Sequence, residues 1–404
     1  MEMSRGICHP VKLTGPLPDP MNLLGDANSF DYPTFASYVD AIDASCPAVN
    51  VAALVGHTSL RSNHMDRLDR TATPAEIEAM SEQLEEALLH GALGLSTGLA
   101  YLSANAASTE EIATLAMLLT EAGGVYATHL RSETEAILDA IDEACMIGRR
   151  ADVPVIISHL KCAGIANWRR SAEVLQSLDR SRENQPIGWD CYPYAAGSST
   201  LDLRQVDERV TIRITWSDPH PEMAGKTLAQ IADAWNVDHR EAAKRLQPAG
   251  AIYHSIAEDD MRAILRHPAT MIGSDGLPND PLPHPRLWGT FPRVLGHYYR
   301  DKKLFSLAEA VRKMTSLPAQ RFGLQDRGWI RKGYQADLVL LDEMTVCDRA
   351  TFDNPVRTAA GIEAVWVNGV LAYRDETPTG RRAGRFLPRQ AKNADTSGRA
   401  NSLF

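Results

Sequence analysis

The chain has 404 residues, 44% of them hydrophobic and 23% charged, which is the composition of an ordinary globular protein with a sizeable core. Its formal net charge is −9, and no lysine and arginine cluster offers phosphate a basic face, which argues against nucleic acid or a membrane surface as partner. The six cysteines form no CxxC pair, no signal peptide is evident, and no apolar run reaches the roughly 18 to 20 residues of a membrane span. We therefore expect a cytoplasmic protein that acts on a small molecule; the sequence does not indicate its oligomeric state.

Short apolar runs that end in a polar or reactive residue recur along the chain, separated by amphipathic helical patterns. This alternation is typical of βα units, and the continuous apolar character fits parallel strands that are buried on both faces. Six runs are candidate strands: Val49–Gly56, Ala92–Ser96, Val125–His129, Val155–His159, Ile187–Cys191 and Thr270–Ser274. The stub Met3–Cys8 makes a seventh, and since a TIM barrel has eight, we expect a TIM-like α/β barrel that lacks its first strand.

The helix predicted after Thr73 carries clear local signals. Thr73 is a candidate N-cap, Pro74 stands at the first helical position, and Glu76 completes a capping box. The apolar residues of the following turns fall on one face, and Gly91 stops the helix. We therefore expect an amphipathic helix that begins at Pro74.

We assign the barrel to residues 1–325, because the alternation of apolar runs and amphipathic helical patterns does not continue beyond them. Within it, residues 206–268 form a polar insertion with two helical segments, which we interpret as a lid or accessory lobe over the barrel mouth. Residues 326–387 contain short strands with Gly and Asn-Gly turns and are predicted to form a small β domain. The polar tail, residues 388–404, is predicted to be disordered.

Four residues with side chains that zinc accepts close predicted strands: Cys8, His129, His159 and Asp275. In a TIM barrel the active site lies at the carboxyl ends of the strands, so these side chains are expected to converge. Two imidazoles, a thiolate and a carboxylate match a zinc site that keeps one position open for water. Zinc lowers the pKa of such a water to about 7 and polarises an amide carbonyl, so the pattern predicts metal-assisted hydrolysis.

Each of these residues also has a simpler explanation. A strand-end histidine is often a hydrogen-bonded structural residue, but His129 and His159 stand thirty residues apart on successive strands, which favours a metal site. Asp275 is alternatively the N-cap of a helix. Cys8 is alternatively an inert small hydrophobe.

Six segments carry a resemblance that runs in order across nearly the whole chain. They are Val55-Gly-His-Thr-Ser-Leu-Arg, Gly94-Leu-Ser-Thr-Gly-Leu-Ala-Tyr, Gly124-Val-Tyr-Ala-Thr-His-Leu-Arg, Val155-Ile-Ile-Ser-His-Leu-Lys, Asp190-Cys-Tyr-Pro-Tyr-Ala-Ala-Gly-Ser-Ser, and Ile272-Gly-Ser-Asp-Gly with His284-Pro-Arg-Leu-Trp-Gly-Thr-Phe-Pro-Arg. With these segments the chain resembles the D-aminoacylase, or N-acyl-D-amino-acid deacylase, family of the amidohydrolase superfamily. The resemblance implies that the substrate is an N-acyl-D-amino acid and that its hydrolysis gives a carboxylate and a D-amino acid.

Residue by residue, the resemblance implies that Cys8, His129 and His159 hold one tightly bound zinc ion, and that Asp275, also at the metal, is the general base. It implies five residues that contact the substrate: Lys161, Tyr192, Ser198, Arg286 and Tyr101. Arg286 suits a free α-carboxylate, because a planar guanidinium group binds a carboxylate through two hydrogen bonds. The alternatives are a solvated strand-end charge for the lysine and core aromatic positions for the two tyrosines.

The chain also departs from the family pattern. The His-x-His pair that helps the superfamily bind a second, weaker metal has no counterpart, so that position lacks two of its ligands. The usual Gly-Asn-Cys-Gly around the thiolate reads Gly6-Ile-Cys-His9, and the usual Arg-Asp-Glu reads Arg131-Ser-Glu133, with one carboxylate fewer. Two alternatives therefore stay open: a catalytically impaired, truncated amidohydrolase, and a cyclic-amide hydrolase of the same superfamily.

Overall fold

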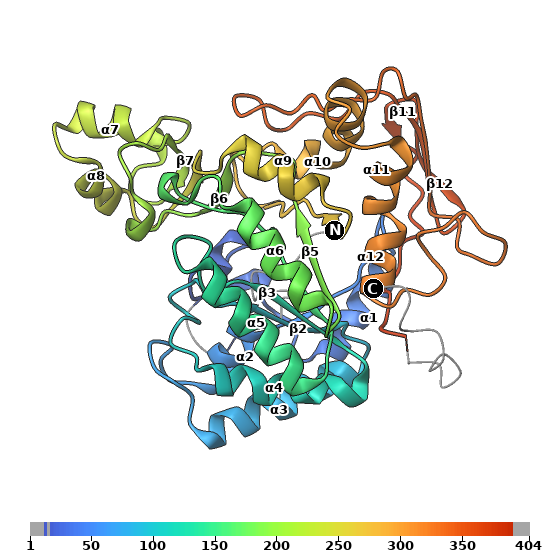
Figure 1. Ribbon diagram of the computed structural model, residues 1–404, viewed down its shortest axis with the longest axis horizontal. Coiled ribbons are helices and arrows are strands. Elements are labelled where there is room, and N and C mark those ends of the chain that lie inside the picture. Colours follow the sequence, from blue (N-terminus) through green and yellow to red (C-terminus); the bar gives the residue numbers. More distant parts are fainter. Residues whose placement is uncertain (1–11, 14–16, 391–404) are drawn as a thin grey trace.

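The computed structural model of this chain describes residues 12–13 and 17–390. In this part of the chain six strands form a parallel sheet in the order β1-β2-β3-β4-β5-β9 (Figure 1). Their bounds are β1 Val55–Gly56, β2 Gly94–Gly98, β3 Val125–His129, β4 Val155–Ile157, β5 Ile187–Cys191 and β9 Thr270–Ile272. Each overlaps one of the six apolar runs from which it was predicted, whereas the seventh predicted strand, Met3–Cys8, lies outside the described residues.

Helices alternate with these strands and continue after the last one. The α-helices that accompany this sheet are α1 Phe35–Ser45, α2 His57–His64, α3 Pro74–Leu89, α4 Thr109–Ala122, α5 Ile137–Ala151, α6 Ser171–Arg182, α9 Glu258–Arg266, α10 Arg286–Arg293, α11 Leu307–Met314 and α12 Ser316–Arg321. Shorter 3-10 turns are η1 Met21–Leu23, η2 Ala27–Ser29, η3 Ile165–Asn167, η4 Leu203–Gln205 and η5 Pro221–Met223, and η6 Val294–Asp301 is a π-helix. The βα alternation predicted from the sequence is thus present.

Helix α3 begins as predicted. The Thr73 hydroxyl accepts the backbone N–H of Glu76, and the Glu76 carboxylate accepts the N–H of Thr73 at 2.8 Å, so the capping box is complete. Beyond the C-terminus, Gly91 has a φ of +93°, a conformation that glycine adopts without steric cost. The local signals in this segment therefore specify both ends of the helix.

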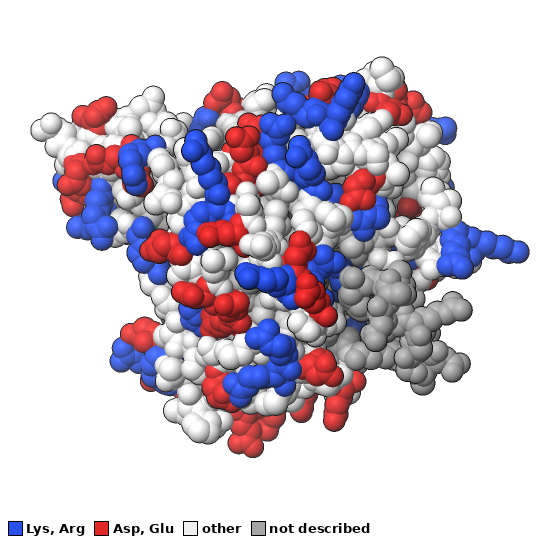
Figure 2. Space-filling model, in the orientation of Figure 1, with Lys and Arg blue, Asp and Glu red and all other residues white. Residues whose placement is uncertain are grey.

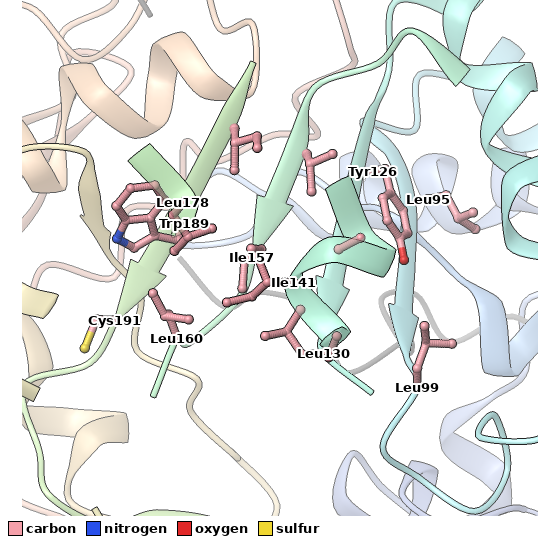
Figure 3. Close-up of a cluster of buried hydrophobic side chains, with 14 of the residues drawn as sticks. Leu95, Leu99, Tyr126, Leu130, Ile141, Ile157, Leu160, Leu178, Trp189 and Cys191 are labelled. Carbon is pink, nitrogen blue, oxygen red and sulfur yellow. The ribbon is translucent and has the colours of Figure 1, made fainter. Parts of the chain in front are cut away.

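The main core lies between the sheet and the helices that cover it. Leu95, Tyr126 and Trp189 on the strands are fully buried, and Ile141 of α5 and Leu178 of α6 belong to the same cluster (Figure 3). Burial of each large apolar side chain contributes about 1.5 to 3 kcal/mol. This packing fixes the position of each strand and, with it, the residues at the carboxyl ends.

A second apolar cluster lies on the opposite face of the sheet. Its members are Leu54, Leu93, Val125, Ala127, Ile156, Met271, Leu317 and Phe322. Within the described residues β1 and β9 are the edge strands of the sheet, each with a single neighbour. A cavity of about 710 Å³ is lined by residues that precede β1, among them Leu54, and by residues that follow β9, among them Leu277.

A separate lobe stands beside the barrel at the upper left of Figure 1. Strands β6 (Gly197–Thr200), β7 (Ile212–Ser217) and β8 (Ala249–Tyr253) form an antiparallel sheet in the order β6-β8-β7, and α7 (Leu228–Trp235) and α8 (His239–Leu246) pack with it around a core of their own. Helix α9 contributes instead to the main core. The strands and helices of this lobe thus span residues 197–253.

A four-stranded antiparallel sheet follows near the C-terminus: β10 Leu338–Leu341, β11 Ile362–Val367, β12 Val370–Arg374 and β13 Thr377–Pro378. Asn368 and Gly369 both have positive φ in the turn between β11 and β12, as expected of an Asn-Gly hairpin. Within the predicted tail, Arg389 donates hydrogen bonds to the carbonyl oxygens of Leu88 and Ala92. Residues 391–404 lie outside the described part.

The surface carries both signs of charge. Figure 2 shows lysine and arginine interspersed with aspartate and glutamate on the face that it draws. None of the helices in the described residues is long and apolar enough to cross a bilayer.

Candidate active site

All predicted site residues within the described part of the chain line one cavity of about 400 Å³. These residues are Tyr101, His129, His159, Lys161, Tyr192, Ser198, Asp275 and Arg286. The barrel strands bring most of them together because their carboxyl ends meet at one edge of the parallel sheet. Cys8, the remaining predicted ligand, lies outside the described residues.

The two histidines face each other across neighbouring strands. His129 is the last residue of β3, and His159 follows the end of β4 by two residues. Nδ1 of His129 lies 3.1 Å from Nε2 of His159, and the exposed fractions of the two residues are 9% and 2%. Two buried nitrogen donors are therefore directed at one point.

The backbone is strained at two of these strand ends. His159 has a φ of +40° and Asp275 a φ of +47°, both in the left-handed region. This conformation costs a residue other than glycine about 1 to 2 kcal/mol, and it persists where the surroundings enforce it, commonly at functional sites.

Glu133 joins the histidines in the same cavity. Its carboxylate accepts a hydrogen bond from Nζ of Lys161 and lies 3.1 Å from Nδ1 of His159. Burial alone would raise the pKa of Glu133, but the charges of His129 and Lys161 and the hydrogen bond with His159 hold it below its ordinary value. Glu133 was not predicted as a site residue; its signals in the sequence were its spacing of four residues after His129 and its place at the end of the Arg131-Ser-Glu133 segment.

The donor set fits zinc. Ligand atoms of His129, Glu133 and His159 all lie within 4.8 Å of one another. Two imidazole nitrogens and a carboxylate oxygen are atoms that zinc binds. A carboxylate that contacts the second nitrogen of a ligating histidine also orients the ring and fixes its tautomer, which is how Glu133 lies against His159.

Arg286 and Asp275 form a buried ion pair on the other side of the cavity. Nη2 of Arg286 lies 2.7 Å from Oδ2 of Asp275 and also donates to the carbonyl oxygen of Ser198 at 3.2 Å. The guanidinium carbon lies 4.5 Å from the centre of the Tyr192 ring. Nε and Nη1 of Arg286 have no hydrogen-bond partner among the described residues, so both are available to a ligand.

The structure bears on the simpler explanations of three residues. Helix α10 starts at Arg286 with Pro285 as its N-cap, so Asp275 caps no helix there. The Lys161 side chain is only 13% exposed and bound to Glu133, so it is not a solvated charge. Tyr192 belongs to the main core cluster, as the simpler explanation expects, but it also lines the cavity, and its hydroxyl has no partner in the part that the structure describes.

Tyr101 completes one wall of the cavity. It is 8% exposed, and its ring centre lies 5.0 Å from that of His129. Its hydroxyl accepts a hydrogen bond from Ser199 at 3.5 Å.

Asp190 is a second residue that was not predicted. It lies in β5, next to the strands that lead to His159 and Asp275, and burial raises its pKa to about 7. Its position inside the apolar run Ile187–Cys191 gave no indication of a site residue.

Comparison with known proteins agrees with this geometry. The amidohydrolase family matches residues 9–373 of the chain. A D-aminoacylase of Alcaligenes xylosoxydans xylosoxydans is 48% identical over 374 residues, which cover 93% of this chain and 77% of that protein.

Two solved structures are closely similar. A D-aminoacylase studied for one-metal activation and second-metal attenuation of its binuclear centre has a TM-score of 0.93 and 47% identity, covering 96% of this chain and 81% of that one. An N-acyl-D-glutamate deacylase from Bordetella bronchiseptica, complexed with zinc and a phosphonate mimic of the tetrahedral intermediate, has a TM-score of 0.90 and 42% identity, covering 95% and 81%. The parallel sheet and its helices thus have the TIM-barrel fold of the amidohydrolases, and the chain belongs to the D-aminoacylase family of that superfamily.

Proposed function

We propose that the protein is a zinc-dependent deacylase that hydrolyses N-acyl-D-amino acids to a carboxylate and a D-amino acid. The observation that carries the proposal is one cavity holding two histidine nitrogens 3.1 Å apart and an Asp275–Arg286 pair, with two guanidinium nitrogens that have no partner among the described residues. The names of the relatives support this choice, since they are a D-aminoacylase and an N-acyl-D-glutamate deacylase that binds zinc.

His129 and His159 would hold the ion, and the family resemblance adds Cys8. When bound, zinc polarises the acyl carbonyl group and acidifies the attacking water. Glu133 keeps the ring of His159 turned so that Nε2 faces His129. We propose that these residues hold one tightly bound ion.

Asp275 is the proposed general base. Its carboxylate takes a proton as the water oxygen bonds to the carbonyl carbon, and it delivers that proton to the nitrogen as the C–N bond breaks. Arg286 binds the α-carboxylate through Nη1, which is buried and otherwise unpartnered among the described residues. Lys161, Tyr192, Ser198 and Tyr101 form the walls that position the substrate.

The test is hydrolysis of enantiomeric pairs by zinc-loaded protein. N-acetyl-D-amino acids are expected to release free D-amino acid, while their L enantiomers and a cyclic amide such as dihydrouracil stay intact. Asp275→Asn is expected to abolish turnover and to retain zinc, whereas Asp301→Asn, at a half-exposed surface position, keeps both. Zinc-loaded protein that hydrolyses no N-acyl-D-amino acid would refute the proposal, and turnover of the cyclic amide alone would favour the other amidohydrolase activity.

A further inference from the structure

Asp190 has its carboxyl group on the inner face of the barrel. Its neighbour Trp189 packs into the core between sheet and helices, and successive side chains of a strand point to opposite faces (Figure 3). Asp190 is 2% exposed and belongs to β5, which pairs with β4 on one side and β9 on the other. The carboxyl group therefore lies between the strands that lead to His159 and to Asp275.

Toward β4, Asp190 holds the segment that carries His159. The backbone of His159 hydrogen-bonds to the Asp190 carboxyl group, and the N–H of Leu160 donates to the Asp190 carbonyl oxygen at 2.8 Å. His159 has the strained φ of +40°. The carboxyl group and the carbonyl oxygen of Asp190 thus both hold the backbone that follows β4, and they oppose relaxation of the strained φ of His159.

Toward β9, Asp190 fills the space beside Gly273, two residues before Asp275. A Cβ atom on Gly273 would lie 2.2 Å from Oδ1 of Asp190, so a larger residue there would displace the carboxyl group. The N–H of Gly273 donates to the carbonyl oxygen of Cys191 at 3.3 Å, which ties the same segment to β5. Oδ2 of Asp190 has no hydrogen-bond partner within the described residues.

We propose that Asp190 is a positioning residue of the metal centre. It sets the backbone of His159, and through its close packing against Gly273 it sets the approach of the segment that carries Asp275. The inference rests on the proposed function only in that the centre binds zinc, and its test does not require turnover.

The test measures zinc affinity by competition with a chromophoric chelator. Asp190→Ala removes the acceptor for the His159 backbone and is expected to weaken zinc binding by about tenfold or more, as is typical when a residue that orients a ligand is lost. Asp190→Asn keeps an acceptor oxygen and is expected to restore the affinity to within about threefold of the parent protein. A parent-like affinity of the Asp190→Ala variant would overturn the proposal.

Asp260 provides a matched control. It is also 2% exposed and accepts the backbone N–H groups of Arg169 at 2.6 Å and Ser171 at 3.2 Å, so its partners are neither His159 nor Gly273. Asp260→Ala is expected to lower the melting temperature and to leave zinc affinity unchanged. Equal weakening of zinc binding by the alanine variants of Asp190 and Asp260 would show general destabilisation and overturn the positioning role.

Gly273→Ala keeps the test decisive if Asp190→Ala does not fold. The added methyl group would push against the Asp190 carboxyl group, and zinc binding is expected to weaken by about tenfold. Unchanged affinity in this variant would contradict the proposal. Parent protein that binds zinc tightly but hydrolyses no N-acyl-D-amino acid would refute the deacylase function alone.

Discussion

Arg286 is held by three contacts, and Nε and Nη1 of its guanidinium group have no partner among the described residues. Asp275 binds Nη2 at 2.7 Å, the Ser198 carbonyl oxygen accepts from the same nitrogen, and the Tyr192 ring lies under the guanidinium plane. The residue is 1% exposed, so its two remaining donors are costly to leave without a partner. A substrate carboxylate bound at Nη1 would satisfy one of them.

Arg286→Lys is therefore expected to raise KM for N-acyl-D-amino acids by about tenfold or more, with a smaller change in kcat. Lysine keeps the charge but cannot offer two N–H groups in one plane, so binding of the carboxylate suffers more than the chemical step. Steady-state kinetics with an N-acetyl-D-amino acid and with its α-carboxamide analogue measure the effect. The variant and the parent protein are expected to differ little on the carboxamide.

Arg293 is the matched control for this substitution. It lies 4.8 Å from the Tyr194 ring and 3.1 Å from an Asp348 oxygen, a setting like that of Arg286, but it does not line the cavity. Arg293→Lys is expected to leave KM unchanged. A similar rise in KM for both lysine variants would argue against a specific carboxylate contact at Arg286.

The cavity residues at strand ends were predictable because of where they stand in the sequence, at the end of an apolar run. His129, His159 and Asp275 each follow an apolar run, and the barrel brings such positions into one cavity. Glu133 and Asp190 were missed for physical reasons. The first acts from a loop whose path the sequence does not define, and the second is a buried carboxyl group inside a strand, where an apolar side chain is expected.

At the scale of elements, a fully buried charge cluster joins α2 to α4. Arg61 donates to Glu111 at 2.6 Å, His57 lies 2.9 Å from the same carboxylate, and all three side chains are inaccessible to solvent. Arg61 also donates to the carbonyl oxygens of Leu68 and Arg70, so the cluster holds the loop after α2 as well. Loss of the carboxylate would leave a buried guanidinium group without its counter-charge.

Glu111→Gln is expected to lower the free energy of unfolding by about 3 to 5 kcal/mol, which is typical when one partner of a buried ion pair is removed. Its neighbour on α4 supplies the control. Glu110 pairs with Arg150 at the surface, where screening makes ion pairs weak, so Glu110→Gln is expected to cause no measurable change. Urea denaturation of both variants compares them, and equal stability would contradict the role given to the buried cluster.

The same cluster predicts a pH dependence. Burial would raise the pKa of Glu111, but the contact with His57 and the charge of Arg61 lower it to about 2. A carboxyl group whose pKa is lower in the folded state stabilises the fold above its unfolded value of about 4.3, and this contribution is lost as the pH falls toward 2. The stability difference between the parent protein and Glu111→Gln should therefore shrink from pH 5 to pH 2; a constant difference would exclude this origin.

Helices and strands were predictable where the segment itself carries a strong sequence pattern. Helix α3 carries its own cap and stop signals, and the barrel strands are continuous apolar runs. Strand β6, Gly197–Thr200, was missed because it consists of small polar residues and acquires its conformation from pairing with β8. That pairing joins segments about fifty residues apart, which no local pattern reveals.

For the whole molecule, the order of the barrel strands followed from the right-handed βα rule, because each strand was expected next to its predecessor. The observed order β1-β2-β3-β4-β5-β9 agrees, with the lobe inserted before β9. The mutual placement of the lobe and the C-terminal sheet depends on tertiary packing and was not predictable. The proposed zinc site joins two neighbouring barrel strands, so zinc binding should be linked to the stability of the barrel.

Zinc is accordingly expected to raise the melting temperature of metal-free protein. The site requires β3 and β4 side by side and is absent from the unfolded chain, so binding stabilises the folded state by RT ln(1 + [Zn]/Kd). At a free zinc concentration of about one hundred times Kd this amounts to about 2.7 kcal/mol, or a rise on the order of 5 °C. Differential scanning fluorimetry of chelator-treated protein against zinc concentration measures it.

Two histidine variants decide whether that rise comes from the cavity. His159→Ala removes one of the paired nitrogens and should lose the zinc-dependent increase. His90→Ala, at a side chain that is 51% exposed on the surface, should keep it in full. If zinc raises the melting temperature of His159→Ala as much as that of the parent protein, the ion binds elsewhere on the chain, and the strand-end histidines are not its ligands.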